Sequence, residues 1–477
     1  MIALTLAEVA AAVGGRLGGG ARGDETAVGI STDSRTTRAG DLFVAVVGEH
    51  HDAHDHAAQA VAAGAVGVLA SRPLDVPCVV VDDTVAALGR LARAVLDRFP
   101  DLVVVGLTGS SGKTSTKDLL AQVLPAVGET LAPAGSFNTE VGLPVTVLGV
   151  GPTTRVLVVE MGARGVGHVR YLTTISPPAV GLVLNVGSAH VGEFGSVDAI
   201  AVAKGELVEA LPAAERGGVA VLNADDPRVR AMASRTAARV VLFGESADAD
   251  VRAESVVLDD AARPSYDLVH AGRRARVASA LHGRHHVANG LAAAAVALVL
   301  GADLDEVAER LTAARPASRW RGDVTDTAAG VTVVNDAYNA NPASMTAALE
   351  TLAAMTHATP TRGPRRAVAV LGEMLELGPA AEAEHTEIGR TAVRLGVERL
   401  VAVGSSASVT AMRDAALAAG GSAVLVEDVG AAADLLRTEL RAGDVVLVKA
   451  SRSVGLERVA EALLAAPVAA QGTGEPA

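Results

Sequence analysis

Cysteine is almost absent from this chain, whose single cysteine is Cys78. One thiol excludes an internal disulfide framework, and such low cysteine usage is typical of a reducing compartment. The surrounding run Val76-Pro-Cys-Val-Val-Val81 is typical of a buried strand. We therefore expect Cys78 to fill space in a core rather than to react.

Long apolar runs and targeting signals are also missing. The longest apolar run, residues 291–300, is too short to span a bilayer and predicts a buried helix instead. Residues 1–17 lack a basic leading segment and include Glu8, unlike a secretory signal peptide. These features predict a soluble, cytoplasmic protein that does not insert into membranes.

Aromatic residues and positive charge are scarce. The chain has 5 Phe, 3 Tyr and 1 Trp, so its cores must be built mainly from Val, Leu, Ala and Ile. Its 54 acidic residues outnumber its 41 lysines and arginines, which gives a formal net charge of −13. This balance argues against a nucleic-acid partner bound through neutralisation of its phosphates.

Apolar residues, by contrast, make up 50% of the 477 residues, enough for sizeable cores and about two to four domains. Short Val- and Leu-rich runs alternate with Ala-rich amphipathic segments, which is typical of an α/β fold with parallel strands. Breaks at Pro100-Asp101 and Arg315-Pro316 divide the chain into predicted domains at 1–99, 100–315 and 316–468. The tail at 469–477 is predicted to be disordered.

The same pattern locates the predicted elements. We expect a helix over 84–98 with Thr84 as its N-cap, hairpins at a sheet edge over 245–280, and helices over 286–300 and 304–314. The predicted strands are 42–47, 66–70 and 78–81 in the first domain, 102–107, 156–159, 180–184, 219–222 and 240–243 in the second, and 331–334, 367–371, 400–403, 423–426 and 445–448 in the third.

The strongest motif is a glycine-rich loop between a strand and a helix, Thr108-Gly-Ser-Ser-Gly-Lys-Thr-Ser115. Its small residues let backbone N–H groups close around a phosphate chain at a helix N-terminus. Lys113 supplies a cation for the terminal phosphates, and Thr114 supplies a hydroxyl for Mg²⁺. The common P-loop pattern has a glycine where this chain has Leu107, and the extra glycine is Gly109 instead. The alternative is an incidental glycine-rich turn.

Three further polar residues follow predicted strands or lie on a predicted helix. Glu160 directly follows the strand at 156–159, where it can hold Mg²⁺ or simply terminate the strand. His190 lies six residues past the strand at 180–184, where a functional role competes with a structural or solvated one. Lys204 lies on a helical pattern and, taken alone, is typical of a solvated surface lysine.

The densest polar cluster of the third domain is Asn335-Asp-Ala-Tyr-Asn-Ala-Asn-Pro342. Asp336 could accept hydrogen bonds from ribose hydroxyls, whereas the asparagines could bind substrate or build the turn. Histidines at 50, 51, 54 and 56 raise the alternative of a metal site. A solvated or substrate-contacting loop explains them better, because the run mixes the faces of any regular element and no cysteine supports it.

Taken together, these motifs resemble the Mur ligases, the ATP-dependent amide-forming family of peptidoglycan precursor synthesis. The resemblance covers the whole chain apart from the tail. It is strongest for the member that joins D-alanyl-D-alanine to UDP-N-acetylmuramoyl-tripeptide through an acyl phosphate. The Asp-Asn-Pro-Arg pattern of the ligase that adds the third peptide residue is not found. The segments that carry the resemblance are Ser31-Thr-Asp-Ser-Arg35, Gly40-Asp-Leu-Phe-Val-Ala45, Asn335-Asp-Ala-Tyr-Asn-Ala-Asn-Pro-Ala-Ser-Met345, and Leu371-Gly-Glu-Met-Leu-Glu-Leu-Gly378 followed by His385.

The resemblance implies three domains: a small α/β substrate domain, a central P-loop ATPase-like domain with a parallel sheet, and a C-terminal Rossmann-like domain. It implies ATP and Mg²⁺ as cofactors, the tripeptide precursor and the dipeptide as partners, and a monomer. The implied catalytic residues are Lys113, Glu160, His190 and Lys204, and the implied metal ligands are Thr114, Glu160, His190 and a carbamylated Lys204.

The resemblance also implies two sets of binding residues. The ATP contacts are Gly109, Ser110, Ser111, Gly112, Lys113, Thr114, Ser115, Asn289, Arg319 and Asp336. The substrate contacts are Thr32, Asp33, Ser34, Arg35, Asn138, Tyr338, Asn339 and Asn341.

The chain departs from the family pattern at Thr139, His286 and Ala450, where the family often has Asn, Asn and Gly, so the contacts made there are not carried over. Two alternatives remain open. One is a sibling ligase that adds a single amino acid to the same precursor or to a folate. The other is a non-catalytic nucleotide sensor or scaffold, which the retained catalytic set disfavours. The sequence does not distinguish lysine from diaminopimelate at the third peptide residue.

Overall fold

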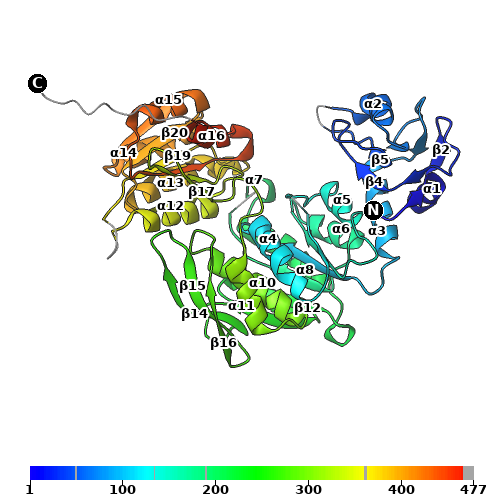
Figure 1. The fold of residues 1–477 in the computed structure, drawn as a ribbon, viewed down its shortest axis with the longest axis horizontal. Helices are drawn as coiled ribbons and strands as arrows, with labels where there is room; N and C mark the ends of the chain where they lie inside the picture. Colours follow the sequence, from blue (N-terminus) through cyan, green and yellow to red (C-terminus); the bar gives the residue numbers. More distant parts are fainter. Residues whose placement is uncertain (49–50, 134, 189–190, 359–362, 466–477) are drawn as a thin grey trace, which may run out of the picture.

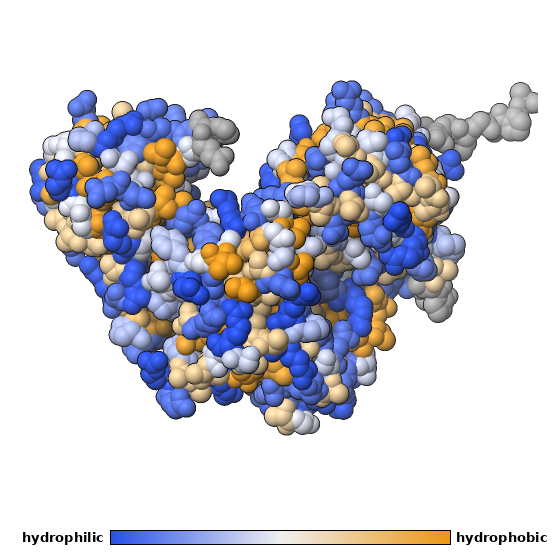
Figure 2. Space-filling view, turned by 180° about the vertical axis from the view of Figure 1, so that it is seen from behind, coloured by the Kyte–Doolittle hydropathy of each residue, from blue (hydrophilic) through white to orange (hydrophobic). Residues whose placement is uncertain are grey.

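The computed structural model describes residues 1–48, 51–133, 135–188, 191–358 and 363–465. They form three lobes, with the N-terminal and C-terminal lobes as two arms joined by a central lobe (Figure 1). Seen from behind, the molecule is hollowed between the two arms (Figure 2). Each lobe is an α/β domain with its own sheet, which confirms the predicted fold class. The predicted tail at 469–477 lies outside the described residues.

The N-terminal lobe is built on a five-stranded sheet in the order β2-β7-β6-β5-β4, parallel except for β2. Cys78 is buried in β7, as predicted. The strands are β2 (Arg16–Gly18), β4 (Gly29–Ser31), β5 (Asp41–Val44), β6 (Gly67–Ala70) and β7 (Cys78–Val80), with a separate pair of β1 (Leu4–Thr5) and β3 (Thr26–Ala27). The helices are α1 (Leu6–Val13), α2 (Ala57–Ala62) and α3 (Thr84–Leu96).

The N-cap of α3 is Asp83, so the predicted N-cap, Thr84, is wrong by one residue. The Asp83 carboxylate accepts the backbone N–H groups of Val85 and Ala86 at 2.8 and 3.0 Å. The Thr84 hydroxyl instead donates to the carbonyl of Ala45 at 3.0 Å. A carboxylate accepts two free N–H groups at once, and its negative charge interacts favourably with the positive end of the helix dipole.

The central lobe contains a nine-stranded sheet in the order β16-β15-β14-β13-β12-β11-β8-β10-β9. The strands from β9 to β14 are parallel, whereas β14, β15 and β16 pair antiparallel at one edge, which confirms the predicted hairpins. The strands are β8 (Val103–Thr108), β9 (Thr130–Leu131), β10 (Val156–Glu160), β11 (Val180–Val183), β12 (Val219–Asn223), β13 (Arg239–Gly244), β14 (Val251–Leu258), β15 (Pro264–His270) and β16 (Arg273–Ala278).

Helices cover both faces of this sheet (Figure 1). The alanine-rich run predicted to be a buried helix forms most of α10, which packs against α4 and α11 and is buried almost all round. Small side chains allow that close packing without large aromatic groups. The helices are α4 (Lys113–Val123), α5 (Gly142–Val147), α6 (His168–Ile175), α7 (Val191–Phe194), α8 (Val197–Glu209), α9 (Pro227–Ala231), α10 (His286–Val299) and α11 (Leu304–Ala313).

The C-terminal lobe contains a six-stranded sheet in the order β17-β18-β22-β19-β20-β21, parallel except for β17. Its strands are β17 (Asp323–Asp326), β18 (Thr332–Asn335), β19 (Ala367–Leu371), β20 (Arg399–Val403), β21 (Ala423–Val426) and β22 (Val445–Lys449). Its helices are α12 (Pro342–Thr356), α13 (Ala381–Arg394), α14 (Ala407–Ala418), α15 (Val429–Glu439) and α16 (Glu457–Ala465). In the described part of the chain, no helix is both long enough and apolar enough to cross a membrane.

The order of the central sheet sets the position of the functional site. Strand β8 lies between β10 and β11. The later strands therefore lie on both of its sides, with β9 and β10 on one side and β11 to β16 on the other. All three strands are parallel and end at the same edge, with Leu107 opposite Glu160 and Thr108 opposite Val183. In open parallel sheets such a change of direction leaves a crevice at the carboxyl ends of the strands, where ligands bind.

Candidate functional site

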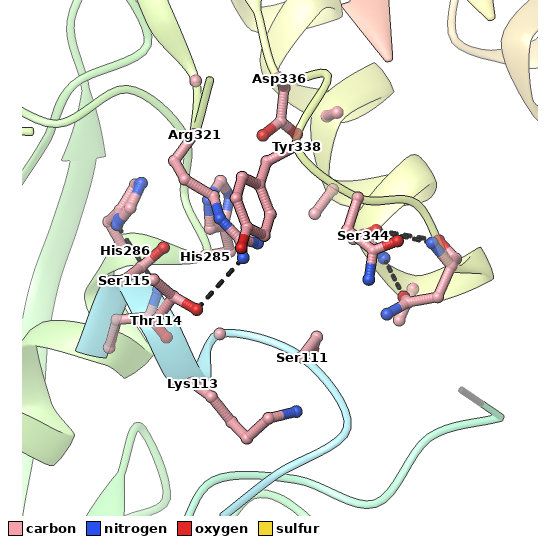
Figure 3. A pocket seen from close by; sticks show the side chains of 18 of the residues that line it. Ser111, Lys113, Thr114, Ser115, His285, His286, Arg321, Asp336, Tyr338 and Ser344 are labelled. Carbon is pink, nitrogen blue, oxygen red and sulfur yellow. Dashed lines mark hydrogen bonds between the residues drawn. The ribbon is translucent and has the colours of Figure 1, made fainter. Parts of the chain in front are cut away.

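A pocket lies at that crevice and is lined by both the central and the C-terminal lobes. The central lobe contributes the loop between β8 and α4 and the first turn of α10. The C-terminal lobe contributes Lys449, Arg321 and the loop between β18 and α12. Figure 3 shows Arg321, Asp336 and Tyr338 at this side of the pocket. The pocket therefore joins the glycine-rich motif to the polar cluster of the third predicted domain.

The glycine-rich loop begins α4 with Gly112 at φ +78°, a conformation that favours glycine. A Cβ atom at Gly112 would lie 2.7 Å from Asn289 Oδ1, so the close approach to α10 also requires glycine. The amide oxygen of Asn185, which follows β11, accepts the N–H groups of Ser110 and Ser111 at 3.0 and 2.9 Å. The loop is thus held open by side chains as well as by its own backbone.

Lys113 folds back over this loop, and its Nζ donates to the carbonyl of Gly109 at 2.7 Å. Burial lowers the pKa of Lys113, and the nearby Glu160 carboxylate opposes that shift. A phosphate group entering the pocket would offer this ammonium group a stronger acceptor than a neutral carbonyl.

An oxygen-rich cluster lies at the start of α4. Thr114 Oγ1 is 3.2 Å from Glu160 Oε2 and 2.9 Å from Ser136 Oγ. Asn138 Nδ2 donates to the other oxygen of Glu160 at 2.7 Å. Hydroxyl and carboxylate oxygens are the ligands that Mg²⁺ prefers, so the side chains of this cluster fit that ion. Within the described ranges, no group of three or more His, Cys, Asp or Glu side chains is placed to hold a metal ion.

His190, predicted as a metal ligand and catalytic residue, lies outside the described residues. Lys204 lies on α8 and is only 4% exposed, so the alternative of a solvated surface lysine is wrong. Burial and the positive charge of Lys113 lower the pKa of Lys204 well below its ordinary value. A larger fraction of its amine is therefore neutral and nucleophilic than for an exposed lysine.

The C-terminal lobe presents a buried ion pair to the pocket. Lys449 Nζ contacts Asp336 Oδ2 at 2.6 Å and donates to the carbonyl of Asn339 at 2.9 Å. Burial lowers the pKa of Lys449, and the Asp336 carboxylate opposes that shift. Asp336, predicted to contact ATP, therefore lines the pocket, with a cationic partner that was not predicted.

The asparagines of this loop build the turn that the sequence allowed as an alternative. Asn341 is the N-cap of α12, with Oδ1 accepting the N–H of Ser344 at 2.9 Å. Asn339 Oδ1 accepts the N–H of Ala340 at 2.9 Å. Asn339, Asn341 and Tyr338 nevertheless all line the pocket. Their turn contacts hold them there, so the two interpretations are compatible.

The two arginines near the start of the C-terminal lobe point in opposite directions. The side chain of Arg319, predicted to contact ATP, is 78% exposed, lies 4.0 Å from Glu461, and is not among the residues that line the pocket. Arg321 instead enters the pocket, where it lies 4.1 Å from the ring centroid of Tyr338 and donates to Thr114 Oγ1 at 3.1 Å (Figure 3). Sequence reasoning missed Arg321 because nothing in the local pattern separates the two.

The residue between them explains the difference. Trp320 has φ +60°, which is rare for a bulky side chain. Its N–H donates to Asp323 at 2.6 Å and its carbonyl accepts the N–H of Tyr338 at 3.1 Å. The left-handed backbone at this position reverses the direction of the following side chain.

The other end of the pocket is formed by the first turn of α10. His282, His285, His286 and Asn289 line it, and the rings of His285 and His286 lie 4.3 Å apart. Burial lowers the pKa of both His285 and His286, and the second shift is the larger. Asn289 Oδ1 accepts the hydroxyl of Thr116 at 3.3 Å, so the predicted contact residue is held by α4.

The predicted substrate residues of the first domain, Thr32, Asp33, Ser34 and Arg35, lie after β4 in the N-terminal lobe and do not line this pocket. Asp33 and Arg35 form an ion pair at 2.6 Å, and hydrogen bonds from Arg35 lower the pKa of Asp33 to about 2. Of the nearby histidines, His54 is buried against Asp52 at 2.5 Å, whereas residue 50 lies outside the described residues.

Known proteins match this chain along nearly its whole length. Family models for the Mur ligase family catalytic domain, the Mur ligase middle domain, and the Mur ligase glutamate ligase domain match residues 26–95, 107–297 and 320–452. The UDP-N-acetylmuramoyl-tripeptide–D-alanyl-D-alanine ligase of Mycobacterium tuberculosis is 48% identical over 506 aligned residues, which cover 98% of each chain.

Solved structures show the same likeness. The structure of MurF from Acinetobacter baumannii superposes with a TM-score of 0.85 at 31% identity, covering 97% of this chain and 99% of that one. The structure of MurF ligase from Thermotoga maritima in complex with ADP superposes with a TM-score of 0.77 at 30% identity, covering 91% and 96%.

Proposed function

This chain belongs to the Mur ligase family, and from that premise we propose that it joins D-alanyl-D-alanine to UDP-N-acetylmuramoyl-tripeptide, using ATP, in peptidoglycan precursor synthesis. The products are UDP-N-acetylmuramoyl-pentapeptide, ADP and phosphate. One observation carries the assignment of the ATP site. Arg321 of the C-terminal lobe donates to Thr114 in the phosphate loop of the central lobe. A phosphate bound at this loop would therefore lie within reach of groups from both lobes.

The reaction that fits the family has two steps. A carboxylate oxygen of the tripeptide attacks the γ-phosphorus of ATP, which forms an acyl phosphate and releases ADP. The amine of D-alanyl-D-alanine then attacks the acyl carbon, loses a proton, and displaces phosphate. Both steps concentrate negative charge, so catalysis depends on positioning and on preorganised cations and N–H groups.

The residues of the phosphate loop supply that environment. The N–H groups at the start of α4, from Lys113 to Ser115, have no earlier turn of helix to bond and point toward an entering phosphate. Lys113 exchanges its bond to the Gly109 carbonyl for a phosphate oxygen. Arg321 approaches from the opposite lobe, where its guanidinium group can bind two oxygens of one phosphate.

Mg²⁺ fits the oxygen cluster of Thr114 and Glu160, with His190 and a carbamylated Lys204 as the further proposed ligands. When bound, the ion screens the negative charge of the phosphates. The low pKa of Lys204 supports the modification, because carbon dioxide reacts with a neutral amine. A new N–C bond forms, the nitrogen loses a proton to solvent, and the resulting carbamate replaces the neutral amine with an anion that can bind the metal.

We assign one task to each domain. Residues 1–99 hold the nucleotide-sugar precursor through Thr32, Asp33, Ser34 and Arg35, and residues 100–315 hold ATP. Residues 316–468 complete the ATP site and hold the dipeptide near Tyr338, Asn339 and Asn341. Asn138 lies beside Glu160, where the tripeptide carboxylate must meet the γ-phosphate. The enzyme is proposed to act as a cytoplasmic monomer.

A phosphate-release assay tests this function directly. Purified protein is given ATP, Mg²⁺ and UDP-N-acetylmuramoyl-tripeptide, with lysine or diaminopimelate as the third residue, and the acceptor is varied. We expect release that depends on D-alanyl-D-alanine, with mass spectrometry showing the pentapeptide product. Release with a single amino acid or with a folate would identify a sibling ligase instead. ATP binding without turnover on any precursor would identify a non-catalytic nucleotide sensor.

A further inference from the structure

The segment 315–321, which we call the strap, connects α11 to the C-terminal lobe and runs antiparallel along α4. Three hydrogen-bonded contacts, which we call ties, join the strap to α4. They lie at Gln122, Asp118 and Thr114 on the helix, each four residues from the next. Because residues four apart lie on one face of an α-helix, the strap follows a single face of α4 from its last turn to its first.

The first tie is reciprocal. Gln122 Nε2 donates to the carbonyl of Arg315 at 3.0 Å, and Gln122 Oε1 accepts the N–H of the same residue at 2.9 Å. A side-chain amide paired with both groups of one backbone residue fixes the direction of the strap as well as its position.

The second tie is buried. Asp118 Oδ2 accepts the N–H of Ser318 at 3.1 Å, while Lys117 Nζ contacts the other oxygen of Asp118. Lys117 is 1% exposed and also donates to the carbonyl of Pro133 at 2.7 Å. A carboxylate whose other oxygen contacts a buried ammonium group is a strong acceptor, and burial shields this tie from water.

The third tie is the contact of Arg321 with Thr114 Oγ1 at 3.1 Å. Among the described residues, the buried Nε of Arg321 has no hydrogen-bond partner. A buried guanidinium donor without an acceptor is costly unless a ligand supplies one. The strap therefore delivers to the phosphate loop a cation whose hydrogen bonds are incomplete without an anionic ligand.

We propose that Gln122 and Asp118 are positioning residues that act through Arg321, by holding the strap so that the guanidinium group reaches the nucleotide phosphates. Neither residue contacts the ligand itself, because neither lines the pocket. The proposal rests on the proposed function, since it requires that the pocket bind a nucleotide. The support of the phosphate site therefore extends to the last turn of α4, far along the helix from the loop.

A double-mutant cycle tests this proposal through Gln122→Ala, Arg321→Ala and the double variant. Gln122→Ala removes both hydrogen bonds to the strap, and one to the carbonyl of Asp118 within α4, without uncovering a buried charge. We expect it to lower kcat for dipeptide-dependent phosphate release, and to weaken ADP binding in calorimetry, each by about tenfold. In the Arg321→Ala background the same substitution should have no further effect, because the residue through which it acts is already absent. Losses that add in the double variant, or a Gln122→Ala variant with parental kcat and affinity, would overturn the proposal.

Two controls separate positioning from folding. Thr130→Ala removes a hydrogen bond to the carbonyl of Gly128 in the same lobe, away from the strap, and should keep parental kcat. Urea unfolding measures the stability of every variant, and a Gln122→Ala loss that followed stability rather than Arg321 would count against positioning. If no acceptor yields phosphate, the proposed function fails, whereas the ADP cycle still decides whether the strap sets Arg321.

Discussion

Lysine is the residue that most clearly marks the site. The chain has four lysines, Lys113, Lys117, Lys204 and Lys449, and uses arginine for every other basic position. Three are almost fully buried and the fourth lies in the phosphate loop. Burial lowers the pKa of Lys113, Lys204 and Lys449. Lys449 was not predicted as a site residue, and this scarcity is the compositional signal that could have identified it.

Replacement of Lys113 tests the phosphate loop. We expect Lys113→Ala to lose at least about 10²-fold in kcat, as when one preorganised charge-stabilising group is deleted. Phosphate release at saturating ATP measures the loss, and circular dichroism confirms that the variant is folded. Turnover close to the parental rate would show that the loop does not hold the reacting phosphates.

Replacement of Lys204 tests the carbamate. Lys204→Ala should be nearly inactive, because the buried position loses the group proposed to hold the metal. Short-chain carboxylic acids should restore part of the rate by placing a carboxylate in the vacated space. The same acids should have no effect on Lys113→Ala, which serves as the control. Full activity of Lys204→Ala without added acid would refute the role.

At the scale of elements, the central strands and long helices could be predicted because buried parallel strands are continuous Val- and Leu-rich runs. The strands that the sequence did not reveal are short and lie at sheet edges; they are β1, β2, β3, β4, β9 and β17. They carry Arg, Gly, Thr or Asp rather than an apolar run. The phosphate loop was found because its motif is local, whereas the contact of Arg321 with Thr114 depends on two segments far apart in the chain.

Helix α10 begins with two histidines whose protonation the fold opposes. Burial lowers the pKa of His285 and His286 below the ordinary value of 6.5, so the unfolded chain binds protons that the folded protein does not. The two histidines should therefore not lower the free energy of unfolding above pH 6.5. Below pH 6.5 the unfolded chain takes up protons, and the free energy of unfolding should fall. The limiting slope is about 1.4 kcal/mol per pH unit for each histidine.

Urea unfolding between pH 7.5 and 5.5 measures this effect, with the parental protein compared to His286→Asn. The variant removes one of the two titrating groups, so its stability should fall less steeply with acid. Parallel pH profiles for the two proteins would contradict the prediction, whatever their absolute stabilities.

At the scale of the whole molecule, the arrangement of the lobes depends on contacts that the sequence does not predict. Besides the strap, the C-terminal lobe meets the central lobe where α7 touches the loop at 376–378 (Figure 1). The N–H of Gly192 donates to the carbonyl of Glu376 at 3.3 Å. A Cβ atom at Gly192 would lie 2.5 Å from the backbone nitrogen of Gly378, so the two backbones meet without room for a side chain.

Gly192→Val should separate the two lobes at this contact and lower kcat by about ten- to a hundredfold, because groups from both lobes must meet at one phosphate. Small-angle scattering should show a more open molecule. Gly165→Ala is the matched control, since nothing lies within 4 Å of its added Cβ. A Gly192→Val variant with parental kcat and parental scattering would show that this contact does not set the lobe arrangement.

The left-handed residue of the strap is also a fluorophore. Trp320 is the sole tryptophan in the sequence, and its indole ring lies between the guanidinium groups of Arg319 and Arg452, at 5.0 and 4.3 Å from the ring centroid. Any emission excited at wavelengths where tyrosine is silent comes from this ring. The protein thus carries an intrinsic fluorophore beside Arg321, and its optical spectrum observes the junction of two lobes without a label.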